Sequence, residues 1–216
     1  MSLCLVSGGQ VSAEFRDALH RAAAITGDRD LIVVGSQSIH GAFDKGLLPR
    51  ESTRSLEVDE IALYDHDEEK MWALSGRGLA YGIEVDAVDI ETCTLSEGWM
   101  QRLIPYPLGN DPEAVIGWCL EPHDLAVAKA VAGRDKDIAF VRALAQASLV
   151  DPQEVLRRLE SLDDHCHVPR QSEVDGAAAF LSSIPQPHQV YRAAKRAIPK
   201  GRRRPTYADV IRGGTD

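Results

Sequence analysis

Two acidic residues alternate with apolar ones along the segment LEVDEIALY, which covers residues 56–64. Because successive side chains of a strand point to opposite faces, Glu57 and Asp59 share one face and the apolar residues share the other. Adjacent carboxylates repel each other. Mg²⁺ relieves that repulsion, since it takes oxygen ligands and keeps room for water and phosphate. The pair predicts a Mg²⁺ site; the alternative is a half-exposed strand whose acids are solvated.

A third acid, Asp86, lies on the segment YGIEVDAVDI at 81–90, which alternates in the same way. If this strand is a neighbour of the first, Asp86 approaches Glu57 and Asp59. Three carboxylates suit phosphoryl chemistry, in which some hold metal ions and one activates a hydroxyl. Asp89 is an alternative third acid, on the opposite face of a regular strand. The pattern predicts a cluster of carboxylates across two strands.

A glycine and a serine, Gly35 and Ser36, follow the apolar run LIVV and open a predicted short helix at 36–43. Glycine allows a close backbone approach, and the start of a helix offers free N–H groups and the positive end of its dipole. Together with the hydroxyl of Ser36, these features suit a phosphate group. The alternative is an ordinary turn after a strand.

Two charged residues lie at the margins of predicted buried helix faces. Lys129 borders an apolar stripe one turn after Leu125, and Asp137 shares an edge with Leu144 on the next helix. Charges at such margins need a partner or a ligand. Either the two groups serve a bound phosphate compound, or Lys129 extends to solvent and Asp137 forms an ordinary ion pair.

These residues must be positioned by a front half that mixes helices and strands and by a back half of helices. Hydrophobic periodicity predicts four strands, at 31–34, 56–64, 81–90 and 115–120. It predicts helices at 11–25, 36–43, 66–74, 122–132, 135–147 and 152–162. Gly27 is expected to end the first helix, Pro122 to begin the fourth and Gly133 to end it.

This order predicts an α+β fold, in which a mixed sheet with flanking helices is followed by a helical C-terminal half. The expected division is an α/β core at 1–120, a helical part at 121–190 and a basic, flexible tail at 191–216.

The charge of the chain is unevenly distributed. Its 216 residues carry a formal net charge of −9, but residues 191–205 hold seven basic residues and no acid, which leaves −16 for the rest. The basic stretch either follows a nucleic-acid backbone or forms a solvated tail. The overall pI of about 5.3 is therefore no argument against a nucleic-acid partner.

Composition excludes several classes of protein. A hydrophobic content of 44% excludes a disordered chain, and without a run of 18 apolar residues we expect no membrane span. The start, MSLCLVSGGQ, lacks the basic and long apolar regions of a secretory signal. The four cysteines form no CxxC pair, so we expect reduced thiols and a cytoplasmic location.

At these positions the chain resembles the nucleotidyltransferase superfamily, whose signature is a strand that ends in hG[GS], followed by [DE]h[DE]h. Gly35-Ser36 matches the first part and Glu57-x-Asp59 the second. The stretch EPHDLAVAKAVAGRDKDIAFVRAL at 121–144 resembles the helical block of bacterial nucleotidyltransferases near the abortive-infection AbiEii group. The likeness covers about residues 30–150.

The resemblance implies roles for individual residues. As Mg²⁺ ligands it implies Glu57, Asp59 and Asp86. For the phosphates of the nucleotide it implies Gly35, Ser36, Lys129 and Arg134. As catalytic residues it implies Asp86, Lys129 and Asp137. The first metal ligand is Glu57 where Asp is commoner, which leaves open a relative that keeps the fold without the activity.

The expected reaction is Mg²⁺-dependent transfer of an NMP from an NTP, such as ATP, to a hydroxyl. By resemblance the acceptor is an RNA 3′ end, a protein or a small molecule, and the protein is a toxin whose partner is an antitoxin. One alternative is an inactive nucleotidyltransferase-fold module that binds nucleotide, RNA or a protein. Another is a phosphohydrolase that uses the same acids. Convergence of the three carboxylates separates the enzymes from the binding module.

Overall fold

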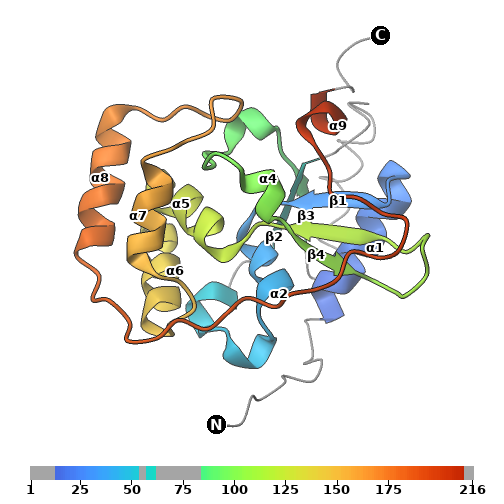
Figure 1. Cartoon of the computed structure of the whole chain (residues 1–216), viewed down its shortest axis with the longest axis horizontal. Helices are drawn as coiled ribbons and strands as arrows, with labels where there is room; N and C mark the ends of the chain where they lie inside the picture. Colours follow the sequence, from blue (N-terminus) through green and yellow to red (C-terminus); the bar gives the residue numbers. More distant parts are fainter. Residues whose placement is uncertain (1–12, 54–56, 62–83, 212–216) are drawn as a thin grey trace.

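The computed structural model describes the backbone of residues 13–53, 57–61 and 84–211 and the side chains of residues 13–53 and 88–210. Figure 1 shows a sheet with helices on both sides and a group of helices beside it. The helix expected at 66–74 lies outside the described residues.

A mixed five-stranded sheet organises the front half, in the spatial order β3-β2-β1-β5-β4. Its strands are β1 (Asp30–Val33), β2 (Glu57–Ile61), β3 (Glu84–Ala87), β4 (Ile104–Pro107) and β5 (Ile116–Cys119). β1 runs parallel to β5 and antiparallel to β2, β3 runs parallel to β2, and β4 runs antiparallel to β5. The expected α+β fold with a mixed sheet is confirmed.

Strand β1 is covered on both faces, which explains why the three residues after Asp30 are all apolar and buried. Leu31 and Val33 pack in one cluster with Phe15 and Leu19 of helix α1 (Ala13–Thr26). Ile32 belongs to the cluster on the other face, which joins the sheet to the C-terminal helices. A segment with packing over both faces needs apolar residues at successive positions, so Leu31–Val33 shows no alternation.

Four helices form the group beside the sheet, and α5 contacts the other three. They are α5 (Pro122–Ala132), α6 (Asp135–Gln146), α7 (Pro152–Leu159) and α8 (Gln171–Ser182). The ends of α5 are those expected, because Pro122 is its first residue and Gly133 follows it with a φ of 63°. Gly27, with a φ of 81°, likewise follows α1. Among the described residues, no helix is long and apolar enough to cross a membrane.

Two of the elements that the sequence patterns did not predict are β4 and α8. β4 contains Pro105 and Pro107, which weaken a strand prediction, but an edge strand that pairs only with β5 tolerates proline. α8 contains Gly176 within a stretch of weak periodicity, and its start is stabilised by Glu173, whose carboxylate accepts the backbone N–H of Arg170 at 2.8 Å.

The basic stretch follows the surface of the body, although its composition favours an unattached tail. Figure 1 shows it running from α8 past the short helix α2 (Ile39–Ala42) to α9 (Tyr207–Ile211). We call residues 190–206 the strap. The backbone N–H of Tyr191 donates to Ser148 O at 2.7 Å, and the backbone N–H of Ala194 donates to Ala42 O at 2.8 Å. The side chain of Arg202 bonds to Asp30 at 2.7 Å.

Candidate active site

The strands that carry the predicted metal ligands, β2 and β3, are parallel neighbours. Their register places Asp59 opposite Asp86 and Glu57 opposite Glu84. Because register partners in a parallel pair lie on the same face, the backbone puts Glu57, Asp59 and Asp86 at adjacent positions on one face. The side chains of these three residues lie outside the described part of the chain.

Asp89, the alternative third acid, has a local task in the structure. Its carboxylate accepts the backbone N–H of Glu91 at 3.0 Å and so caps a short 3₁₀ turn, Ile90–Thr92. The residue is exposed. An acid that caps an exposed turn after β3 is a structural group, which leaves Asp86 as the stronger candidate on this strand.

The Gly-Ser turn lies directly beside β2. β1 and β2 pair antiparallel with Val33 opposite Glu60, so the chain that leaves β1 continues alongside β2, and the 3₁₀ turn Ser36–Ser38 contacts that strand. The expected helix at 36–43 is this turn plus the four-residue helix α2. So short a helix adds little dipole, and a phosphate here would depend on the backbone of Gly35 and on hydroxyls.

Ser38 is a polar residue of this turn that the sequence patterns did not single out. It is fully buried, and its hydroxyl has no hydrogen-bond partner in the described part of the chain. A buried hydroxyl without a partner carries a desolvation cost that a ligand or a water molecule would remove. Two serines two residues apart after a strand were the available signal.

A cavity of about 400 Å³ joins segments that are distant in the sequence. Its wall includes Val34 and Gly35 from the end of β1, Val88 just after β3, and Lys129 and Arg134 from the end of α5 and the residues after it. The other lining residues are Thr92, Cys93, Thr94, Leu95, Ala128, Val131, Ala132, His167 and Glu173. Three of the residues expected to bind phosphate therefore meet at one cavity, next to the strands that carry the acids.

Lys129 and Arg134 share one buried carboxylate. The Lys129 Nζ atom lies 3.1 Å from Asp137 Oδ1, and the Arg134 Nε atom lies 2.5 Å from Asp137 Oδ2. Asp137 is 2% exposed and Lys129 12%, whereas Arg134 is 59% exposed. Burial opposes ionisation of Asp137, but the hydrogen bond from Arg134 and the charge of Lys129 outweigh it and lower the pKa of Asp137.

This arrangement supplies two cations and one carboxylate at the edge of the cavity. Asp137 holds Lys129 in place, and the ring of Phe140, 5.9 Å from the Nζ atom, packs beside it. A lysine ammonium has three donors, and one bond to Asp137 leaves donors for a ligand. The triad can therefore present positive charge to an anion from a fixed position.

Some cavity residues were not recognisable as site residues from the sequence. Thr94 is buried, and His167 is held by a bond from its backbone N–H to Cys93 O at 2.9 Å. Glu173 comes from α8, a helix that the sequence patterns missed. Thr94 lies more than 70 residues before His167 and Glu173, so no local motif connects it to them.

The other end of α5 carries a closed polar network. Glu121 caps the helix and bonds to the ring of His123 at 2.8 Å and to Arg158. Burial by itself raises the pKa of Glu121, but the bonds from His123 and the charge of Arg158 lower it to about 2. Asp124 is fully buried, and its partners are Ser96, Arg102 and Arg158. The sequence EPHD thus anchors α5, whereas the later KAVAGRDKD borders the cavity.

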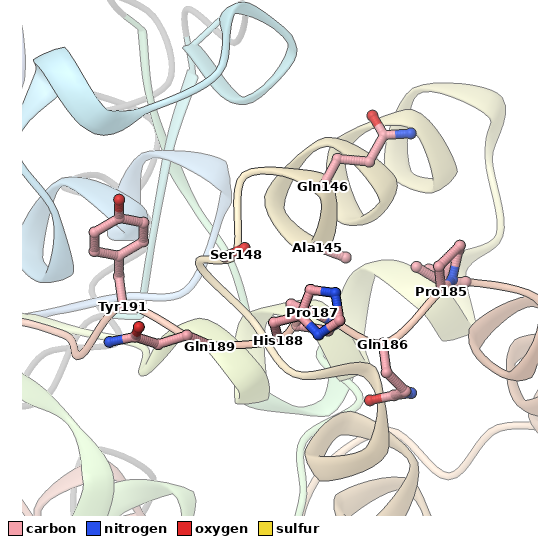
Figure 2. A pocket seen from close by; sticks show the side chains of 10 residues that line it. Ala145, Gln146, Ser148, Pro185, Gln186, Pro187, His188, Gln189 and Tyr191 are labelled. Carbon is pink, nitrogen blue, oxygen red and sulfur yellow. The ribbon is translucent and has the colours of Figure 1, made fainter.

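A further hollow, of about 520 Å³, lies between α6 and the segment that follows α8. Figure 2 shows its side chains, including Gln146, Gln186, His188 and Gln189. None of its ten lining residues is Asp, Glu, Lys or Arg. A hollow without fixed charges suits neither a metal ion nor a triphosphate, so the cavity beside Lys129 is the better candidate.

Comparison with protein families gives one result. The sequence model of a family described as "Nucleotidyltransferase of unknown function (DUF6036)" matches residues 13–175, well over half of the chain. No curated protein and no solved structure matches the chain significantly. The matched range contains the sheet, the cavity triad and α5, and it ends before the strap.

Proposed function

The chain belongs to this DUF6036 family of nucleotidyltransferases, and from that premise we propose that it transfers an NMP from an NTP to a hydroxyl acceptor in a Mg²⁺-dependent reaction. One observation carries the proposal. Gly35, Lys129 and Arg134 line one cavity, beside the paired strands that bear the acids. Cations in the cavity and acids on the neighbouring strands suit a nucleoside triphosphate, whose charge requires cations on one side and a metal on the other.

The residue types and their backbone positions support Mg²⁺ as the metal. Asp59 and Asp86 are register partners, and Glu57 lies two residues along the same strand face, so carboxylate oxygens are available from adjacent positions. Among the described side chains no cluster of three potential ligands occurs elsewhere. When bound, the ion would neutralise charge on the phosphates and on the departing pyrophosphate.

The chain's own residues would bind the nucleotide and move one proton. Lys129 and Arg134 bind the β- and γ-phosphates, and Asp137 positions both cations. Asp86 accepts the proton of the acceptor hydroxyl. The acceptor oxygen forms a bond to the α-phosphorus while the bond to the bridging oxygen breaks and pyrophosphate leaves. A buried carboxylate that fixes the cations removes the cost of arranging them during the reaction.

Transfer of label from an α-labelled NTP, incubated with Mg²⁺ and either cellular RNA or lysate, tests the proposal. We expect labelled product with the wild type and none with Asp59→Ala. Glu160→Ala is the matched control, because Glu160 is an exposed acid that does not line the cavity. Equal labelling by the wild type and Asp59→Ala would disprove the assignment, and labelled free NMP in place of labelled acceptor would indicate a phosphohydrolase.

A second candidate is a module that binds nucleotide without transferring it, which the glutamate at position 57 favours. It predicts that calorimetry detects NTP binding, weakened by Lys129→Gln, while no acceptor becomes labelled. Binding with transfer supports the enzyme, and binding without transfer supports the module.

The toxin role implied by the AbiEii-like resemblance forms a separate part of the proposal. The proposed substrate, an NTP, occurs in the cytoplasm, which agrees with the cytoplasmic location expected for this protein. Induced expression of the wild type in a bacterial host is then expected to arrest growth, and Asp59→Ala is not. Equal growth of the two strains, at equal protein levels, would leave the transferase proposal standing and remove the toxin role.

A further inference from the structure

A groove of about 850 Å³ lies between the strap and the first turns of α5 and α7. The strap contributes four cationic side chains to its lining, those of Arg192, Lys195, Arg196 and Arg204. The opposite wall holds Arg102, Arg157 and Arg158 together with Glu121, Asp151 and Glu154. The two walls differ in how their charges are balanced.

On the wall formed by the body, the arginines are neutralised by acids. Arg102 pairs with Asp124 at 2.9 Å, and both Arg157 and Arg158 pair with Glu154. These ion pairs belong to the network that anchors α5. They contribute little net charge to the groove.

On the strap, the two arginines that are fixed beside the groove form no ion pair with an acid among the described residues. Arg196 lies over the ring of Tyr106 at 4.8 Å and bonds to Gly41 O at 3.3 Å. Arg204 lies over the ring of Trp118 at 5.8 Å and bonds to a backbone carbonyl, and its burial lowers the pKa of Arg204. Within the described residues, no carboxylate forms an ion pair with either arginine.

The neighbouring strap arginines show the opposite arrangement. Arg202 pairs with Asp30 at 2.7 Å and Arg203 with Asp209 at 2.6 Å. Neither lines the groove. Arg202 and Arg203 of the strap therefore pair with acids. Arg196 and Arg204 are instead each fixed by an aromatic ring and a carbonyl group, and they keep their positive charge at the groove. Arg192 and Lys195 add two exposed cations beside them.

We propose that this groove binds the phosphate backbone of a single RNA strand. Fixed guanidinium groups suit phosphate oxygens, because the planar fork is already oriented. Tyr191 also lines the groove with 57% of its surface exposed, and its ring is a platform for stacking a base. The carboxylates of the opposite wall accept hydrogen bonds from ribose hydroxyls and base amino groups. An acidic peptide has neither ribose hydroxyls nor base amino groups to donate to those carboxylates.

The groove is separate from the cavity and goes beyond the proposed transfer reaction. Glu121 and His123, at the first turn of α5, line the groove, whereas Lys129, in the last turn, lines the cavity. The family match ends at residue 175, so it does not include the strap. RNA binding in the groove therefore stands or fails independently of nucleotide transfer.

The test is fluorescence anisotropy of a labelled single-stranded RNA of mixed sequence with the full chain and no NTP. Arg192→Gln with Lys195→Gln is expected to weaken binding about tenfold and to lower the slope of log K against log salt by about 0.7 for each lost phosphate contact. Tyr191→Ala is expected to weaken binding several-fold with an unchanged slope. The matched control is Lys136→Gln with Arg142→Gln, which removes the same charges from α6, a helix that does not line the groove.

Two results would overturn the proposal. One is equal loss of binding in the strap variant and the α6 control, which would mean a general charge effect. The other is displacement of the RNA by an equal concentration of polyglutamate, which would assign the groove to an acidic protein segment. Asp59→Ala is expected to bind RNA like the wild type, so failure of the transfer reaction and failure of the groove are distinguishable.

Discussion

The two ends of α5 carry similar chemistry in different surroundings. At the first turn, Asp124 is fully buried and every partner that it has is a side chain of the same network. At the last turn, Lys129 borders a cavity of about 400 Å³ and pairs with Asp137 of α6, which is almost as buried as Asp124. A buried ion pair is therefore not a functional signal by itself. Among the described residues Lys129 pairs with one acid and keeps donors toward the cavity, whereas Arg158 at the first turn pairs with three acids.

The difference follows from how each carboxylate is satisfied. The acids of the first turn accept bonds from two arginines, a serine and a histidine, so each of these arginines already has an acidic partner where it borders the groove. Such a network holds helices together, and removal of one member leaves buried charges unpaired. Asp137, the α6 acid that pairs with the last turn, is satisfied by two residues that both line the cavity, so a change there is expected to affect a ligand more than the fold.

The largest expected effect is at the first turn. Asp124→Ala removes the shared acceptor of Arg102 and Arg158 and leaves both guanidinium groups short of a partner. We expect the free energy of unfolding to fall by about 3–5 kcal/mol, measured by urea denaturation. The control variant, Glu160→Gln, alters an exposed acid just after α7 and is expected to change the free energy of unfolding by less than about 0.5 kcal/mol. A small effect of Asp124→Ala would erase the distinction between the two ends.

Acid should destabilise the first turn through Glu121. Its pKa in the folded protein is about 2, against an ordinary value of 4.5. The stabilisation is therefore complete above pH 4.5 and is lost as the pH falls toward 2. The shift corresponds to about 3 kcal/mol. Urea denaturation between pH 6 and pH 2.5 should show a flatter acid branch for Glu121→Gln than for the wild type, and parallel curves would contradict the assignment.

At the last turn, the expected effect is on the ligand. Lys129→Gln removes a cation from the cavity but leaves Asp137 bonded to Arg134, so we expect a stability loss of about 1–2 kcal/mol. Label transfer should fall about 100-fold, and Lys136→Gln should match the wild type in both measurements. If Lys129→Gln were as destabilising as Asp124→Ala and left nucleotide affinity unchanged, the Lys129–Asp137 pair would be structural, like the Asp124 network at the other end of α5.

The smallest expected effect belongs to Arg134. Its side chain is 59% exposed, so loss of its ion pair with Asp137 should cost at most about 1 kcal/mol of stability. Nucleotide affinity, measured by calorimetry at low salt, should fall about tenfold for Arg134→Gln and recover in part for Arg134→Lys. An affinity equal to that of the wild type would restrict phosphate binding to Lys129.

Local rules in the sequence determined several elements and the types of residue that the site contains. Pro122 and Gly133 mark the ends of α5 because proline suits a first helical position and glycine accepts a positive φ. The alternation around Asp59 and Asp86 predicted two strands, and both are present. Such signals need only a few adjacent residues, so they survive without knowledge of the rest of the fold.

Tertiary structure alone decided which of those residues meet. β4 and α8 became stable through pairing with β5 and packing against α7, despite prolines in one and weak periodicity in the other. The lysine at position 129 gained its carboxylate partner and its cavity from the way that α6 and the end of β1 pack around α5. The strap, with a composition typical of a solvated tail, became one wall of a groove because carbonyl groups and aromatic rings of the body hold its arginines. Contacts between distant segments depend on the packing of the whole chain, which no local pattern encodes.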